Sequence, residues 1–249
     1  MTPQTLKTLS VQALIEAGAC KEGLDWITPI IEAGDLVEVQ RRLVTEHWDY
    51  CLWCQDHGFD YDSLLAFPLI IREGETLDTL PEGQVCVLKG GTIRNLKGGT
   101  VNNFCEGTVN NFWDGTVNYF NGGTIHNFNG GTVNDFKGGM VNFLNGGMVH
   151  NFKGGTVNYF CEGTVNIFWG GTVSIFWGGT VNYFSGGTVN NFNGGTVKEP
   201  KGTGVLIVCS GTFDAKSASE GCVVIDRRKS RDRPDVYLGG KRLVEVHAE

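Results

Sequence analysis

The sequence predicts a mainly β protein: an octapeptide-repeat β-solenoid with an N-terminal α-helical domain and a small C-terminal β domain. Fourteen eight-residue units run without a break through residues 90–201. Each unit joins a glycine-containing turn to a short Thr-Val-Asn-x-Phe segment, which is typical of a strand. The flanks differ, because residues 1–72 have the apolar spacing of helices and residues 202–249 have short apolar runs between polar loops.

The N-terminal segment, residues 1–72, is expected to form a small aromatic-rich helical domain. Ser10 is placed to cap a first helix, and a second apolar stretch surrounds Trp26. Helical spacing then continues through residues 36–44 and 47–53.

Residues 73–89 indicate a linker and a first strand that lead into the array. A Pro-Glu-Gly turn at 81–83 precedes four apolar residues at 85–88. From residue 90 the octads follow the consensus G-G-T-V-N-x-F-x. The second position is always Gly, the fourth is Val or Ile, and the seventh is Phe or Leu until the last octad, whereas positions six and eight vary. A repeat this strict outweighs local propensity.

The variable positions six and eight must face outward. Strict alternation would then put Thr, Asn and Phe inside and every Val outside. We therefore expect a bend near the fifth residue, which turns Val and Phe inward together. The Asn side chains would stack between coils as a hydrogen-bonded ladder, because an unpaired buried donor costs about 1–3 kcal/mol.

If each coil takes two octads, the array makes seven coils and a rod of roughly 30 Å. The helical domain can cover one end, and Pro200 breaks the repeat before a β segment that can cover the other. Strands are expected there near 205–209, 222–226, 235–238 and 243–247. The competing architecture is an intertwined triple-stranded β-helix, with one octad from each of three chains in every layer.

Charge and cysteine usage narrow the function classes. Residues 1–89 carry fifteen acidic and six basic residues, but the array carries five and six, which argues against a DNA mimic or a phosphate-gripping rod. The eight cysteines are scattered, the polar start lacks the pattern of a secretion signal, and no run is long enough to span a membrane. A cytoplasmic protein with free thiols is expected.

The octads GGTV and GGTI resemble those of uncharacterised bacterial and phage proteins with octapeptide-repeat β-solenoids. The Ala19-Cys20 pair, Trp26 and residues 48–53 resemble a small helical module of similar phage-associated proteins. A looser resemblance links the octads to phage central spikes, which favour Val-x-Gly where this chain has Phe-x-Gly. These resemblances imply a phage or prophage origin, in which the protein would be assembled into a particle, and they carry no activity or catalytic residues.

A metal site is the first chemical candidate. His47, Cys51 and Cys54 share one helix face and could ligate zinc. The surrounding tryptophans and leucine instead indicate a packed core, in which cysteine is common. We therefore expect no metal and no cofactor.

Catalytic and nucleic-acid sites are not expected either. The Gly pairs lack the Lys-Ser/Thr of a phosphate loop, and the array has too few acidic residues for calcium repeats or a glycosidase pair. The single basic run, 227–233, contains Asp232 and is interpreted as a solvated loop, so nucleic acid is not an expected partner.

The expected function is structural or binding: a rigid β-solenoid that spaces or presents interaction surfaces, with a homo-oligomer or a protein bound by the helical domain or a solenoid face as partner. The alternatives are an ice-binding solenoid with Thr columns, a subunit of a trimeric phage spike or fibre, and an uncharacterised enzyme with a site at a solenoid end. Outward apolar columns sixteen residues apart mark the candidate interface, unless the C-terminal segment covers them. Its residues are Phe143, Tyr159, Ile167, Trp169, Ile175, Trp177 and Tyr183.

Overall fold

The computed structural model divides the chain into two compact units, Met1–Ile70 and Ile71–Glu249, and each is described by itself. The described residues are 10–34, 39, 42, 47, 49–50, 53–54, 57, 59, 69–80, 85–219, 221–232 and 234–243. Within them, no helix is both long enough and apolar enough to cross a membrane.

The N-terminal unit begins with two short helices, α1 (Val11–Glu16) and α2 (Lys21–Glu32). The Ser10 side chain accepts a hydrogen bond from the Ala13 backbone N–H, which confirms the expected cap. Cys20 caps α2 in the same way, with its Sγ accepting from the Gly23 N–H at 3.4 Å. The helices expected over 36–44 and 47–53 lie mostly outside the described residues.

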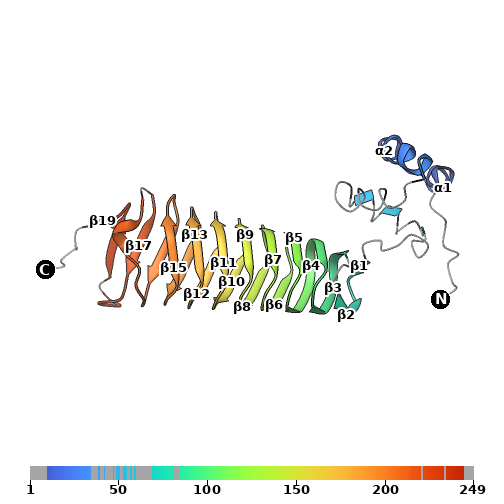
Figure 1. The fold of residues 1–249 in the computed structure, drawn as a ribbon. Coiled ribbons are helices and arrows are strands. Elements are labelled where there is room, and N and C mark those ends of the chain that lie inside the picture. The colour runs from blue at the N-terminus through green and yellow to red at the C-terminus, as the bar shows by residue number, and fades with distance from the viewer. Residues whose placement is uncertain are drawn as a thin grey trace. The chain divides into compact units, whose positions relative to one another are not determined.

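The second unit is a β-solenoid of about nine turns (Figure 1). This confirms the single-chain architecture over the intertwined trimer. Its strands are β1 (Leu69–Arg72), β2 (Thr76–Leu80), β3 (Val85–Leu96), β4 (Thr100–Phe112), β5 (Thr116–Phe120), β6 (Thr124–Phe128), β7 (Thr132–Phe136), β8 (Met140–Leu144), β9 (Met148–Phe152), β10 (Thr156–Phe160), β11 (Thr164–Phe168), β12 (Thr172–Phe176), β13 (Thr180–Phe184), β14 (Thr188–Phe192), β15 (Thr196–Pro200), β16 (Val205–Val208), β17 (Val223–Asp226), β18 (Asp235–Leu238) and β19 (Lys241–Arg242).

Each coil takes two octads, as the register shows. Tyr159 pairs in parallel with Phe143 on one side and Ile175 on the other, sixteen residues away in each direction. Successive octads therefore belong to different ladders. We name ladder A the parallel run β6, β8, β10, β12, β14, and ladder B the run β5, β7, β9, β11, β13, β15.

The expected bend is present at the fifth octad position. In the pairing of β10 with β12 the partners run from Val157 to Tyr159 and omit the residue between them, Asn158. Val157 and Phe160 are both buried, with at most 1% of each side chain exposed. The two ladders thus turn their Val and Phe residues into one shared core, and their position-six side chains face opposite ways.

The core is a stack of phenylalanine rings. Phe136 lies on Phe152 with ring centroids 4.6 Å apart, and Phe152 lies on Phe168 at the same spacing. Burial of a Phe or Val side chain contributes about 1.5–3 kcal/mol. Every coil repeats this contribution, which makes the rod stiff along its length.

The Asn ladder expected at the bend is also present. Asn118 Nδ2 donates to Asn102 Oδ1 at 2.9 Å, and Asn134 Nδ2 donates to Asn118 Oδ1 at 2.9 Å. Most of these side chains are half-buried at the surface of the bend rather than enclosed in the coil. Asn103 is at octad position six, which was expected to face outward, but it is buried and its Nδ2 has no hydrogen-bond partner among the described residues.

Parallel pairing extends beyond residues 90–201 at both ends. Strand β2 pairs with the second half of β3 in the same register as the octads, Thr76 opposite Thr92. After the array, β16 and β17 continue ladder A in parallel, and the antiparallel strands β18 and β19 follow them. Three of the expected C-terminal strands therefore lie close to their predicted positions, and the fourth, near 243–247, falls almost wholly outside the described residues.

Candidate functional site

The register places the seven candidate interface residues on two different ladders. Ladder A carries Phe143, Tyr159 and Ile175 at position six of successive coils, and Trp177 directly follows β12. On ladder B, Ile167 pairs with Tyr183, and Trp169 directly follows β11. Both expected columns exist, but they face opposite sides of the solenoid. One flat partner surface cannot contact both.

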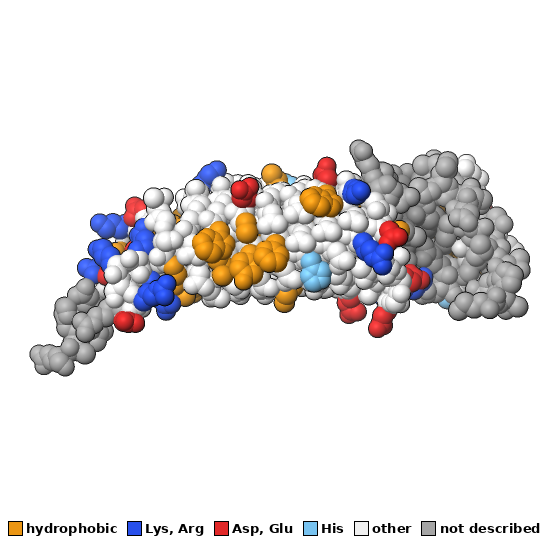
Figure 2. Space-filling view, turned by 90° about the horizontal axis from the view of Figure 1, so that it is seen from below, with side chains coloured by type: hydrophobic (Ala, Val, Ile, Leu, Met, Phe, Trp, Pro, Cys, Tyr) orange, Lys and Arg blue, Asp and Glu red, His pale blue; other side chains and the backbone are white. Residues whose placement is uncertain are grey.

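The column on ladder A is continuous and exposed. The rings of Phe143 and Tyr159 stack with centroids 4.9 Å apart and planes within 10° of parallel. Their exposed fractions are 42% and 38%, and that of Trp177 is 58%. Apolar side chains gather in the middle of the solenoid on the face seen in Figure 2.

Polar amides continue the same column toward the N-terminal end. Asn127 Nδ2 donates to Asn111 Oδ1 at 3.1 Å, and Asn111 Nδ2 donates to Asn95 Oδ1 at 3.2 Å. These three residues occupy the position of Phe143 in earlier coils. Because their amides pair with one another, the apolar column has a defined boundary on this side.

The two ladders differ in charge. Five successive octads of ladder A contain no Asp, Glu, Lys or Arg: 122–129, 138–145, 154–161, 170–177 and 186–193. The ladder B octads between 114 and 185 carry Asp114, Asp135, Lys137, Lys153 and Glu162. One face of the solenoid is therefore uncharged over five coils, whereas the opposite face is charged.

The charges of ladder B are paired locally. Lys153 Nζ lies 2.9 Å from Asp135 Oδ1, and Asn151 Nδ2 donates to the same oxygen at 3.0 Å. Burial raises the pKa of Asp135, but the hydrogen bonds from Lys153 and Asn151 outweigh it and leave this pKa below its ordinary value. Lys137 Nζ lies over the Tyr119 ring, 4.8 Å from its centroid.

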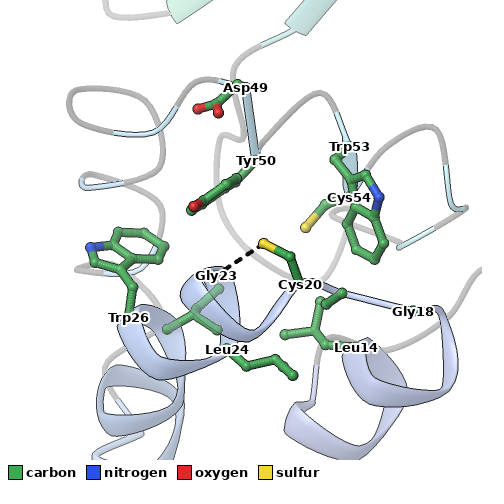
Figure 3. A pocket seen from close by; sticks show the side chains of 12 residues that line it. Leu14, Gly18, Cys20, Gly23, Leu24, Trp26, Asp49, Tyr50, Trp53 and Cys54 are labelled. Carbon is green, nitrogen blue, oxygen red and sulfur yellow. Dashed lines mark hydrogen bonds between the residues drawn. The ribbon is translucent and has the colours of Figure 1, made fainter.

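The N-terminal unit holds an apolar pocket of about 300 Å³ (Figure 3). Cys20, Trp26, Tyr50, Trp53 and Cys54 are among its lining residues. Burial, followed by the nearby Glu22 and Cys20, raises the pKa of the Tyr50 hydroxyl, so this group is a neutral donor at pH 7.

The proposed zinc ligands are placed only in part. His47 stacks on Tyr50 with centroids 4.9 Å apart and meets Trp26 edge-on at 4.5 Å. Cys54 is buried in the small core of this unit, and Cys51 lies outside the described residues. Among the described residues, no three His, Cys, Asp or Glu side chains are grouped as metal ligands would be.

The basic run 227–233, interpreted from the sequence as one solvated loop, contains both paired and unpaired cations among its described residues. Arg228 forms a bidentate pair with Asp226, at 2.9 and 2.6 Å, and Lys229 Nζ lies 3.9 Å from an oxygen of Asp235. The remaining two arginines of the described run, Arg227 and Arg231, line a cavity at the C-terminal end of ladder A. Sequence reasoning missed this cavity, because Arg227 joins the ladder only through a loop whose length departs from the octad repeat.

The fold and these surfaces define a single-chain β-solenoid with one face that is uncharged over five coils. No protein-family model matches the sequence, and comparisons with curated proteins and with solved structures give no significant match.

Proposed function

We propose that this protein is a structural or binding protein, not an enzyme, whose rigid solenoid joins a second copy through the uncharged face of ladder A. The observation that carries the proposal is the column of exposed Phe143, exposed Tyr159 and half-buried Ile175 within five uncharged octads. Interface centres are depleted of charged residues and enriched in aromatic ones. The resemblance of the octads to phage-associated repeats supports assembly into a particle, after synthesis in the cytoplasm, as the setting.

A second copy fits this face better than a charged partner does. The five octads carry no charge that could complement an acidic or basic surface, and the arginines Arg227 and Arg231 lie beyond them at the C-terminal end of the ladder. Two identical uncharged stretches meet without repulsion. Under two-fold symmetry with the solenoids antiparallel, Tyr159 would meet its own counterpart and Phe143 would meet Ile175. The charged ladder B would remain in water and keep the assembly soluble.

The Thr columns support ice binding less well. Thr156 and Thr172 align between coils, but Met140 and Met148 interrupt the columns on both ladders. A flat ice-binding surface requires an unbroken row of small hydroxyl side chains.

The test replaces two column residues on ladder A, Phe143→Asp with Tyr159→Asp. Light scattering of the parent should give about twice the chain mass of 27.1 kDa, and that of the double variant should give the mass of one chain. Circular dichroism should show the same β signal for both, because the two side chains lie on the surface. This separates dissociation from unfolding.

The control is Tyr183→Asp, to be compared also with Tyr159→Asp alone, because it makes that single change at the same octad position on ladder B. Tyr183 is 48% exposed, close to the exposure of Phe143. The control should keep the parent mass. A parent protein that is monomeric at high micromolar concentration would overturn the proposal, and a control variant that also dissociates would overturn the assignment to ladder A.

A further inference from the structure

The C-terminal end of ladder A carries a cavity of about 370 Å³, which falls in the range of small-molecule sites. Its lining residues are Ile175, Asn191, Asn193, Cys209, Arg227 and Arg231. This cavity adjoins the apolar column at Ile175, which belongs to both, but its other lining side chains are amides, arginines and a thiol.

The chain builds the cavity by stacking the ends of successive strands. The Cys209 backbone N–H donates to the Phe192 carbonyl at 2.8 Å, and the Arg227 N–H donates to the Val208 carbonyl at 2.7 Å. The side chains of Asn193, Cys209 and Arg227 therefore follow one another along the edge of the ladder, each just after a strand. Arg231 comes from the loop after β17.

The two arginines are free to bind a ligand. Neither guanidinium of Arg227 and Arg231 has an ion pair or hydrogen bond within the described part of the chain. Their neighbour Arg228 is instead fixed by Asp226 and by the Gly211 carbonyl at 3.1 Å. Both side chains line the same cavity and are exposed, so an anion bound there would gain charge-assisted hydrogen bonds from them.

The rest of the lining favours an oxyanion. Its described lining residues include no carboxylate, and among them the side-chain amide of Asn193 makes no hydrogen bond. Cys209 Sγ donates to Asn191 Oδ1 at 3.5 Å, which orients the Asn191 amide within the wall. Guanidinium groups match the oxygens of phosphate in bidentate geometry, and an amide supplies a further donor.

We infer that this cavity binds the phosphate group of a small molecule, with Arg227 and Arg231 on its oxygens, Asn193 as an additional donor, and Ile175 against the remainder of the ligand. Ile175 also belongs to the column proposed as the interface, so phosphate binding is tested separately from self-association. The Phe143 and Tyr159 variants leave every lining residue of the cavity unchanged.

The first experiment is calorimetric titration of the full chain with inorganic phosphate, and in a parallel arm with a sugar phosphate. Arg227→Gln with Arg231→Gln should weaken binding by at least about tenfold, because charge-assisted hydrogen bonds are lost. Lys229→Gln is the matched control: it removes one charge from the same loop at a side chain that is 87% exposed and does not line the cavity. It should bind within about twofold of the parent.

The second experiment needs no variant. Alkylation of Cys209 by iodoacetamide, followed by peptide mass spectrometry, should slow when phosphate is present, whereas alkylation of the exposed Cys20 should not. Sugar phosphate that binds more tightly than inorganic phosphate would identify an organic ligand, and equal affinity would identify the free anion. No binding by the parent at about 10 mM phosphate, or an equal loss in Lys229→Gln, would refute the site.

Discussion

Replacing Gly147 by valine changes one turn of the solenoid in two ways at once. The backbone there has φ +76°, a conformation that costs a residue with a β-carbon about 1–3 kcal/mol. A β-carbon would also lie 2.6 Å from the Gly131 carbonyl oxygen in the adjacent coil, where only backbone movement can relieve the overlap. Overpacking of this kind costs about 1–3 kcal/mol more. Together, backbone strain and overpacking should lower the free energy of unfolding by about 2–6 kcal/mol.

The assay is thermal unfolding followed by circular dichroism. For a unit of this size, 1 kcal/mol lowers the melting temperature by about 2–4 °C, so the variant should melt roughly 10 °C below the parent. Gly74→Val separates the two effects. Its φ is +81°, but a β-carbon would meet nothing within 4 Å, so only the backbone term applies. A Gly147→Val variant that melts within about two degrees of the parent would contradict both effects, and one whose melting temperature falls no further than that of Gly74→Val would contradict the overlap with Gly131.

Two further predictions concern the sulfur-containing residues. Burial raises the pKa of the Cys86 thiol from 9.0 to about 12 and that of the Cys222 thiol from 9.0 to about 11. The buried neutral thiols therefore contribute fully to the free energy of unfolding below pH 9.0, and this contribution is lost as pH rises from 9.0 through the raised pKa values. Chemical denaturation should show a shallower alkaline loss for Cys86→Val than for the parent, and identical profiles would contradict the burial argument. Elemental analysis of the purified protein should find no stoichiometric zinc. One zinc per chain, released by a chelator together with the helical signal, would show that His47, Cys51 and Cys54 are ligands.

The coil could be predicted from the repeat because some octad positions accept only one or two residue types, whereas others accept many. Val or Ile at position four and Phe or Leu at position seven are three residues apart, so both can face inward only if the chain bends between them. The pairing that omits Asn158 shows this bend. The Asn ladder was predicted because a buried side-chain amide without a hydrogen-bond partner lowers stability. These inferences needed no knowledge of the particular side chains of any one coil.

The ends were less predictable because pairing there does not follow the octad spacing. Cys86 opposes Val101 fifteen residues on, whereas Val87 opposes Asn103 sixteen residues on, so a residue is skipped at the bend. Strand β17 opposes β16 at a spacing of eighteen. The cavity with Arg227 depends on this last spacing, and only the three-dimensional path of the intervening loop sets it.

The two-octad coil also fixes the unit by which the array can lengthen or shorten. Gain or loss of a single octad would move every later octad to the opposite ladder. Uncharged octads would then follow charged ones on the same face, and the apolar column at Tyr159 would be interrupted. Gain or loss of sixteen residues would leave both faces intact and change only the length of the rod. The uncharged face is therefore preserved only when repeats are gained or lost in pairs, although each repeat folds in the same way.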